Sequence, residues 1–272
     1  MDDLRFGFGK NWLNYVKEVN EESIQAAKEN IQLWVGNENL NDKRIIDIGC
    51  GSGIHSYAFF ELGAKEVISF DYDINSVRAA RILWEKSGKP KNWKIFQGSV
   101  LEIEFLKGLG QFDLVYSWGV LHHTGDLWKA ISNTNYYLTN DDSIIWLALY
   151  QGVDTFQHDL KLKINYNTAG YLGKRFIVWK EIFRIMKRRR VKGKNPLTWN
   201  VKRGRGMSTY YDLIDWLGGY PYEVCTVDQL SNYMAKHGNW GLLKYNDDEA
   251  CAVTIFKKNI DDVEPMYQTD KY

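Results

Sequence analysis

The sequence predicts an α/β fold: a doubly wound, mostly parallel sheet with an inserted basic helical cap. Two observations predict it. Between residues 44 and 150, short apolar or β-branched runs alternate with stretches whose apolar residues recur at helical spacing. That alternation is typical of a parallel sheet with helices on both faces. At residues 151–220 it gives way to a basic, aromatic and glycine-containing stretch, which we interpret as an insertion over the mouth of a pocket.

The individual elements follow in chain order. Residues 9–35 carry apolar side chains at steps of three and four, which predicts a helix. Apolar runs predict strands at 44–49, 66–71, 93–98, 112–119 and 143–150. Helices are expected between them at 54–63, 74–88 and 126–138. After the insertion we expect a helix at 226–238, capped near its start by Thr226 or Asp228, and closing strands at 241–245 and 250–258.

Length and charge bound the organisation of the chain. The 272 residues suit one large α/β domain or a core domain with an insertion. The net charge of +1 alone indicates no polyanionic partner, but residues 151–205 hold 15 Lys and Arg against 3 Asp and Glu. We divide the chain into an N-terminal helical flap (1–43), an α/β core (44–150), a basic and aromatic cap (151–220) and a segment that completes the core (221–272).

The cysteines and the apolar runs indicate the cellular compartment in which the protein works. Cys50, Cys225 and Cys251 are too few and too scattered for a disulfide framework or a zinc site. The N-terminal residues are polar and lack the apolar region of a signal peptide. The longest apolar run, at 144–150, is far too short to span a bilayer. We therefore expect a reducing cytoplasm.

A glycine loop follows the first predicted strand, in the sequence "RIIDIGCGSG". Such a loop lets a ligand approach the backbone closely. A dinucleotide fingerprint reads G-x-G-x-x-G, but its last position is Ile54 here. The second predicted strand ends in Asp71, and a carboxylate there can accept hydrogen bonds from both hydroxyls of a ribose. Strand, glycine loop, helix, strand and terminal acid in this order indicate an adenosine cofactor.

At these positions the sequence resembles the class I S-adenosylmethionine-dependent methyltransferases, over roughly residues 44–150 and more loosely over the last strands. "DIGCGSG" resembles the first motif of that family, "SFDYD" its ribose-binding strand end, "QGSVLE" its adenine-side loop and "FDLVYSWGVLHHTGD" its fourth motif. The resemblance implies a seven-stranded sheet with an antiparallel last strand. It also implies S-adenosyl-L-methionine as cofactor and S-adenosyl-L-homocysteine as product.

The resemblance also implies roles for individual residues. The glycine loop would pack against the methionine part of the cofactor, Asp71 would hold the ribose, and Tyr72 would lie along the adenine. Ser99 stands where the family often has Asp, so its hydroxyl and the backbone at Val100 would recognise the adenine. Asp47 either contacts the cofactor or ties the N–H groups of the loop. The candidate cofactor-binding residues are Asp47, Gly49, Cys50, Gly51, Gly53, Asp71, Tyr72, Ser99, Val100, Ser117 and Trp118.

Two adjacent histidines follow the fourth predicted strand. Methyl transfer from a sulfonium is an in-line displacement, in which the enzyme mainly positions the acceptor and excludes water. A hydroxyl or ammonium acceptor must also lose a proton, and His122 or His123 can take it. The alternative is that either imidazole merely bonds nearby backbone. No third ligand is spaced to join the pair, so no metal site is expected.

The cap carries two notable stretches. Residues 174–190 can form a basic amphipathic helix, with Phe176, Trp179, Phe183 and Met186 on one side. We favour a lid helix whose apolar face packs on its own domain. The alternatives are docking on a membrane surface, on RNA or on an anionic substrate.

The stretch 203–223 is rich in polar and aromatic groups that can fix a polar acceptor, or that can simply fold the loop on itself. Its candidate substrate-binding residues are Tyr210, Tyr211, Asp212, Tyr222 and Glu223. Near the N-terminus, Phe6, Phe8 and Trp12 form either a flap over the cofactor or an anchoring staple.

The sequence therefore predicts an S-adenosylmethionine-dependent methyltransferase acting on a hydroxyl or amine of a small or medium polar acceptor. Three alternatives remain. One methylates RNA or a lipid-linked substrate through the basic insertion, and one is a catalytically silent binding protein with this fold. The third, a nicotinamide-dependent oxidoreductase, is disfavoured by Ile54. A small-molecule acceptor is the expected partner; nucleic acid or a membrane surface is not favoured, and the sequence gives no oligomeric state.

Overall fold

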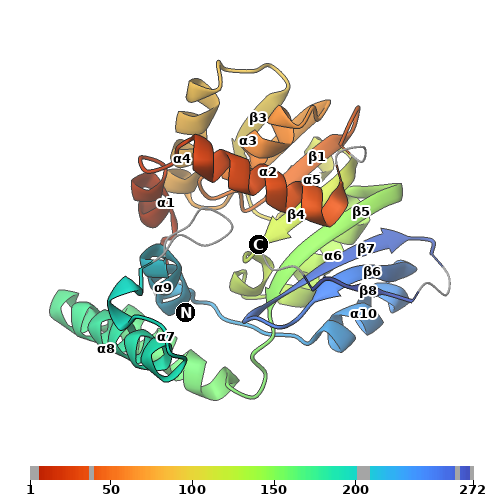
Figure 1. The fold of residues 1–272 in the computed structure, drawn as a ribbon. Helices are drawn as coiled ribbons and strands as arrows, with labels where there is room; N and C mark the ends of the chain where they lie inside the picture. Colours follow the sequence, from red (N-terminus) through yellow and green to blue (C-terminus); the bar gives the residue numbers. More distant parts are fainter. Residues whose placement is uncertain (1–5, 37–39, 201–208, 261–263, 270–272) are drawn as a thin grey trace.

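The computed structural model describes residues 6–36, 40–200, 209–260 and 264–269. Within these ranges the core is an eight-stranded sheet in the order β3-β2-β1-β4-β5-β7-β6-β8 (Figure 1). The strands are β1 (Arg44–Ile48), β2 (Glu66–Asp71), β3 (Trp93–Gln97), β4 (Phe112–Trp118), β5 (Thr139–Tyr150), β6 (Trp240–Asn246), β7 (Cys251–Lys258) and β8 (Met266–Tyr267).

The predicted fold class is confirmed, with one strand more than expected. Strands β1 to β5 pair in parallel, and the strand order reverses between β1 and β4. The predicted antiparallel strand is β7, which runs against both β5 and β6. The additional strand is β8, whose two residues pair in parallel with the outer edge of β6.

Helices cover both faces of this sheet. The core helices are α1 (Gly9–Tyr15), α2 (Glu21–Val35), α3 (Ile54–Glu61), α4 (Ile74–Lys86), α5 (Ile103–Leu109), α6 (Leu127–Tyr137) and α10 (Val227–Lys236). Side chains of α2, α3 and α4 share one buried cluster with Ile45 of β1. Those of α5, α6 and α10 share a second cluster with the next residue, Ile46. Since successive strand residues point to opposite faces, the two clusters lie on opposite sides of the sheet.

The helix expected over 9–35, the start of β5 and the helix α5 differ from the sequence-based expectation. The helix expected over 9–35 is two helices, because the side chain of Asn20 accepts a hydrogen bond from the backbone N–H of Ser23 and starts α2 anew. The helix α5 and the first four residues of β5 were not predicted. At α10 the cap is Thr226, which forms a capping box with Gln229.

The cap consists of three helices, α7 (Phe156–Thr168), α8 (Tyr171–Val191) and α9 (Thr209–Gly218). Tyr166 of α7 and Leu213 and Leu217 of α9 form a small buried apolar cluster, against which side chains of α8 pack. Figure 1 shows α9 beside α1, although the two are far apart in the sequence, and α8 at the periphery of the molecule. The part of the cap at 201–208 lies outside the described residues, and the segment boundaries at 43, 150 and 220 stay predictions.

The N-terminal segment is joined to the cap by hydrogen bonds. The amide of Asn11 donates to Asp215 Oδ1 at 2.8 Å, and the backbone N–H of Phe6 donates to the carbonyl of Tyr220 at 3.1 Å. These contacts close one side of the space between the cap and the sheet. Among the described residues, the structure contains no helix with the length and apolar character needed to cross a bilayer.

Candidate active site

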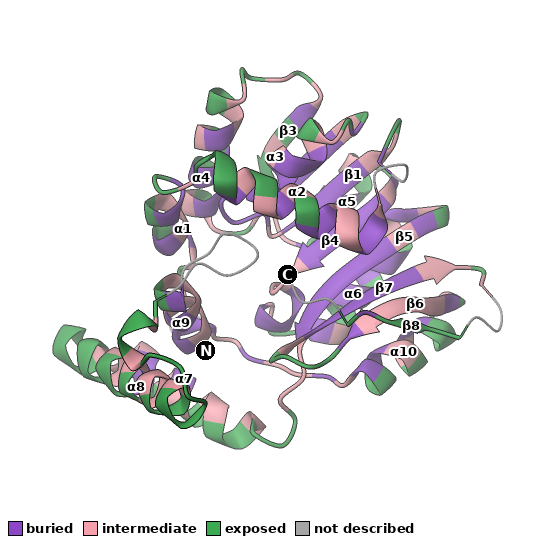
Figure 2. Ribbon diagram, viewed as in Figure 1, coloured by how far each residue is buried: buried purple, intermediate pink, exposed green. Residues whose placement is uncertain are grey.

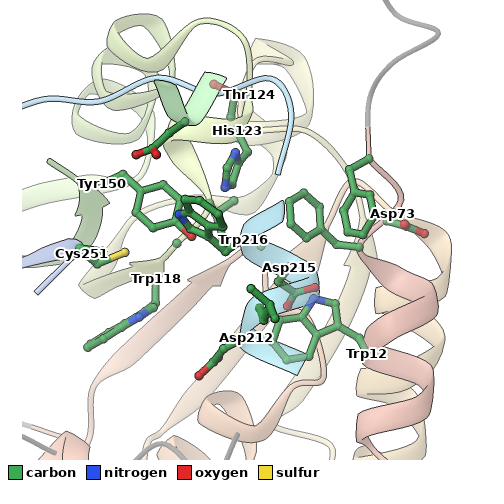
Figure 3. A pocket seen from close by; sticks show the side chains of 18 of the residues that line it. Trp12, Asp73, Trp118, His123, Thr124, Tyr150, Asp212, Asp215, Trp216 and Cys251 are labelled. Atoms are coloured by element: carbon green, nitrogen blue, oxygen red, sulfur yellow. The ribbon is translucent and has the colours of Figure 1, made fainter. Parts of the chain in front are cut away.

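A cavity of about 1030 Å³ lies at the carboxyl ends of β1, β2 and β4, where the strand order reverses. Ligands of open α/β sheets bind at this edge. One side of the lining comes from the loops after the first four strands, and the other comes from α7, α8 and α9. Figure 3 shows His123, Trp118 and Tyr150 on the sheet side, facing Asp212 and Asp215 of α9. The volume is at the upper end for ligand pockets, so a cofactor and a second molecule fit together.

The glycine loop between β1 and α3 lacks side chains because its neighbours leave no room for them. Gly49, Gly51 and Gly53 have φ values of +72°, +55° and +80°, which L side chains rarely adopt. A Cβ on Gly49 would lie 2.4 Å from the Val120 side chain, and one on Gly51 would lie 2.8 Å from the Trp12 indole. Gly49 lines the cavity, whereas Cys50 is buried outside the lining.

Asp71 holds this loop against the end of β2. Its carboxylate accepts hydrogen bonds from the backbone N–H of Gly51 at 3.0 Å and of Asp73 at 2.9 Å. It also lines the cavity, beside the exposed ring of Tyr72. Burial raises the pKa of Asp71 to about 6. A carboxylate has about four acceptor sites, so two backbone bonds leave capacity for a ligand.

Asp47 lies behind the loop, outside the cavity lining, at the end of a buried hydrogen-bond chain. The indole N–H of Trp93 donates to Ser69 Oγ at 2.8 Å, Ser69 donates to Ser56 Oγ at 2.7 Å, and Ser56 donates to Asp47. Because an indole N–H only donates, the chain runs in one direction and needs an acceptor at its end. Burial, with a smaller contribution from the charge of Asp71, raises the pKa of Asp47 to about 7.

The loops after β3 and β4 complete the sheet side. Ser99 and Val100 line the cavity, and Ser99 Oγ accepts a hydrogen bond from the backbone N–H of Leu101 at 3.2 Å. Trp118 also lines it, whereas Ser117 is buried outside the lining and donates to the carbonyl of Ile48 at 3.2 Å. The structure thus brings six predicted cofactor residues into the lining: Gly49, Asp71, Tyr72, Ser99, Val100 and Trp118.

The two adjacent histidines occupy different environments. His122 is fully buried outside the lining, its Nδ1 accepts a hydrogen bond from the backbone N–H of Tyr150 at 3.2 Å, and burial lowers its pKa well below the usual value. His123 lines the cavity, with Nδ1 2.6 Å from the carbonyl oxygen of Pro221. A carbonyl only accepts, so Nδ1 carries the proton and Nε2 has the lone pair of a base. The geometry therefore favours His123 over His122 as a base.

The predicted acceptor residues mostly lie outside the cavity. Asp212 is in the lining, but Tyr210, Tyr211, Tyr222 and Glu223 are not. The hydroxyl of Tyr211 donates to Glu18 at 2.8 Å, and Glu223 accepts from the backbone N–H of Leu127 at 3.0 Å, at the start of α6. Tyr222 is buried and stacks on Phe156, with ring centroids 5.6 Å apart. In the structure these three side chains connect segments of the protein.

Sequence reasoning missed the contribution of α7. Thr155, His158, Asp159 and Leu162 all line the cavity. Their spacing of i, i+3, i+4 and i+7 places them on one helix face, which is a signal the sequence did carry. The cap-side residues of the lining are Thr155, His158, Asp159, Leu162, Glu181, Arg184, Ile185, Arg188, Thr209, Asp212, Leu213, Asp215 and Trp216. This side therefore combines acidic, basic and aromatic groups.

A buried lysine joins α7 to α9 behind this lining. Lys163 donates to the carbonyl of Trp216, and its ammonium lies 4.6 Å from the Trp216 ring and 4.5 Å from the Tyr222 ring. Burial lowers the pKa of Lys163 to about 7. Aromatic faces attract a cation electrostatically, so the rings offset part of the desolvation of the ammonium group.

Known proteins resemble the chain in sequence and in fold. Residues 39–188 match a family model described as a methyltransferase domain. A ribosomal protein L11 methyltransferase of Pasteurella multocida is 38% identical over 63 residues, 23% of this chain and 22% of that protein. The match thus spans only about a fifth of that relative's length.

Two solved structures share the fold. Magnesium protoporphyrin IX methyltransferase from Synechocystis PCC 6803, with bound SAH, has a TM-score of 0.53 at 14% identity and covers 89% of both chains. PKMT2 from Rickettsia typhi has a TM-score of 0.59 at 12% identity, covering 88% of this chain and 54% of that one. At these sequence identities the two structures show a shared fold and nothing about the substrate.

The Asp47→Asn variant should alter the pH dependence of stability. The native pKa of Asp47, about 7, lies above the unfolded value of 3.8, so native Asp47 keeps a proton that the unfolded chain releases. Its contribution to the free energy of unfolding therefore falls as pH rises from about 4 to about 7. The Asn amide oxygen can still accept from Ser56. We compare the free energy of unfolding of the variant with that of the parent. The variant's advantage should be roughly 2–3 kcal/mol larger at pH 8 than at pH 5.

Urea unfolding at both pH values measures this difference. The matched control is Asp142→Asn, which changes an exposed carboxylate and should show no such increase. If Asp47→Asn changes the free energy of unfolding by the same amount at pH 5 and pH 8, Asp47 is ionised in the native state at both pH values.

Proposed function

The chain belongs to the methyltransferase domain family, and we infer that it is a class I S-adenosylmethionine-dependent methyltransferase. From this premise we propose that it transfers the methyl group to a hydroxyl or amine of a small or medium polar acceptor held under the cap helices. One observation carries the proposal: a single cavity joins Asp71 and the strand-end loops to His123 and to the polar lining of α7, α8 and α9. We also propose that the enzyme is cytoplasmic, because Cys50, Cys225 and Cys251 form no disulfide with one another and would stay reduced there.

The cofactor side of the cavity fits S-adenosylmethionine. Asp71 offers a carboxylate with remaining acceptor capacity to the ribose hydroxyls, and Tyr72 lies next to it for the adenine ring. A Cβ on Gly119, which lines the cavity, would meet no protein atom within 4 Å, so this backbone is open to a ligand. When bound, the cofactor supplies a methyl group on a positively charged sulfonium.

The acceptor side suits a polar molecule. The carboxylates of Asp159, Asp212 and Asp215 and the guanidinium groups of Arg184 and Arg188 all line it. These side chains make this part of the cavity polar and charged, and a purely apolar acceptor would remove them from water without offering them hydrogen bonds. Hydroxyl and amine groups provide both donors and acceptors, so they match this mixed lining best.

His123 is the proposed base for the acceptor. The hydrogen bond from its Nδ1 to the carbonyl of Pro221 fixes the tautomer in which Nε2 carries the lone pair of a base. The rings of Phe8 and Tyr150 lie 5.3 Å and 5.6 Å from the imidazole and line the same cavity, so they exclude water around it. Positioning by the cap and proton removal by His123 together constitute the proposed mechanism.

The Asp71→Ala variant tests the cofactor side. The change removes the acceptor for the ribose hydroxyls, and a charged hydrogen bond contributes roughly 1.5–3 kcal/mol. Affinity for S-adenosylmethionine, measured by calorimetry, should fall about tenfold to a hundredfold. Glu66→Ala, at the opposite end of the same strand, is the matched control and should bind like the parent. Unchanged affinity in Asp71→Ala, with native circular dichroism, would refute the role, as would binding of NAD alone by the parent.

Two substitutions at His123 test the base. His123→Ala should lower single-turnover methyl transfer by about 10²–10⁴-fold while leaving cofactor affinity nearly unchanged. His123→Asn keeps an N–H that can reach the Pro221 carbonyl but lacks Nε2, so it should be equally slow. The measurement uses labelled cofactor and an acceptor found by screening hydroxyl and amine compounds. Restored activity in His123→Asn would show that the imidazole acts only by positioning the loop.

A further inference from the structure

The outer face of α8 carries an exposed apolar stripe. Leu172, Phe176, Trp179 and Phe183 follow one another at steps of four and three, so they share one face of the helix. Their exposed fractions are 79%, 72%, 67% and 65%. The prediction that this face packs on the protein is therefore wrong for the three aromatic residues. Figure 2 shows much of α8 as exposed surface at the edge of the molecule.

A second apolar face explains how α8 is seated. Ile177, Val178, Ile182 and Ile185 pack against the buried cluster shared with α7 and α9. On this inner side Glu181 is buried, pairs with Arg184, and both residues line the cavity. The fold thus uses the aliphatic face for packing. The aromatic face contributes nothing to the cap cluster and remains available to a partner.

The exposed face is also strongly basic. The steps of four and three continue from Phe183 to Lys187 and Arg190, and Lys180 lies beside the same stripe. All three cations are exposed. Residues 171–194 contain ten Lys and Arg and a single acid, Glu181, which is buried on the inner side. The outward surface of this segment therefore carries an aromatic stripe with cations beside it and a purely cationic continuation at Lys187 and Arg190.

We propose that the outer face of α8 docks the enzyme on the surface of an anionic lipid bilayer. Phe and Trp side chains on a helix lying in the interface insert at headgroup level, and neighbouring Lys and Arg residues attract anionic headgroups. An aromatic stripe followed by cations on one exposed helical face has both parts of this chemistry. The proposal does not depend on the identity of the methyl acceptor.

Two other partners fit this face less well. Single-stranded nucleic acid binds in basic grooves where aromatic side chains form stacking platforms. The stripe instead lies on the exposed face of α8, a helix at the periphery of the molecule (Figure 1), and includes the aliphatic Leu172. A second copy of the chain would bring two strongly basic faces together, and like charges across an interface oppose association.

Co-sedimentation of the full chain with vesicles tests the proposal. Binding to vesicles that mix phosphatidylcholine with phosphatidylglycerol should be at least about tenfold tighter than binding to phosphatidylcholine alone, and should weaken as salt increases. The double variant Trp179→Ser, Phe183→Ser should bind the mixed vesicles at least about tenfold more weakly, because two inserting rings are lost. Lys187→Glu, Arg190→Glu should abolish the preference for the anionic lipid.

The matched control is Tyr136→Ser, which removes a ring that is 76% exposed on α6, away from the cap. It should bind vesicles like the parent. Circular dichroism and cofactor binding establish that each variant is folded. Absence of vesicle binding, or equal binding by the aromatic double variant, would overturn the proposal. So would tighter binding to a single-stranded RNA oligonucleotide than to vesicles, or a dimer that Trp179→Ser dissociates.

Discussion

The shape of the glycine loop depends on a buried hydrogen bond that joins its two ends. Asp47 stands two residues before Gly49, Ser56 stands three residues after Gly53, and the Ser56 hydroxyl donates to the Asp47 carboxylate. The hydrogen bonds continue through Ser69 of β2 to the indole of Trp93, the first residue of β3. One line of hydrogen bonds thus fixes α3 and three neighbouring elements of the sheet relative to one another. The loop then needs no side chains of its own to keep its shape.

Carboxylates at the end of β2 hold the glycine loop and α1 in place beside the cavity. Asp71 accepts from Gly51, while the next acid, Asp73, accepts from the backbone N–H of Gly9 at 2.9 Å and so attaches α1 to the sheet. That attachment brings Trp12 against Gly51. Burial raises the pKa of both Asp47 and Asp71. Each carboxylate therefore lowers the free energy of unfolding at a pH where it is ionised. The arrangement is understandable where Asp71 also binds a cofactor, because functional sites commonly retain groups that a purely structural core would not.

Local patterns in the sequence predicted the sheet, the glycine loop and Asp71, because strand period, turn glycines and a strand-terminal acid are all encoded within a few residues. They could not separate His122 from His123, since adjacent residues in a short turn point in different directions and only tertiary contacts decide which one lines the cavity. The same limit applied to Tyr211 and Glu223. Their polar groups suit an acceptor site, but they bond to Glu18 and to the start of α6, which are distant in the sequence.

The helix α8 shows most clearly why periodicity alone was insufficient. It has two apolar faces, one aromatic and one aliphatic, and either could have been seated on the domain. The structure seats the aliphatic face, since its branched side chains fit the space that α7 and α9 leave. The helix is about 10–12 Å thick, so lipid on its outer face would lie one helix diameter from Glu181 and Arg184 in the cavity. If the proposed methyl transfer holds, the polar cavity and the aromatic exterior lie on opposite faces of one helix, so docking on lipid would leave the cavity lining uncovered.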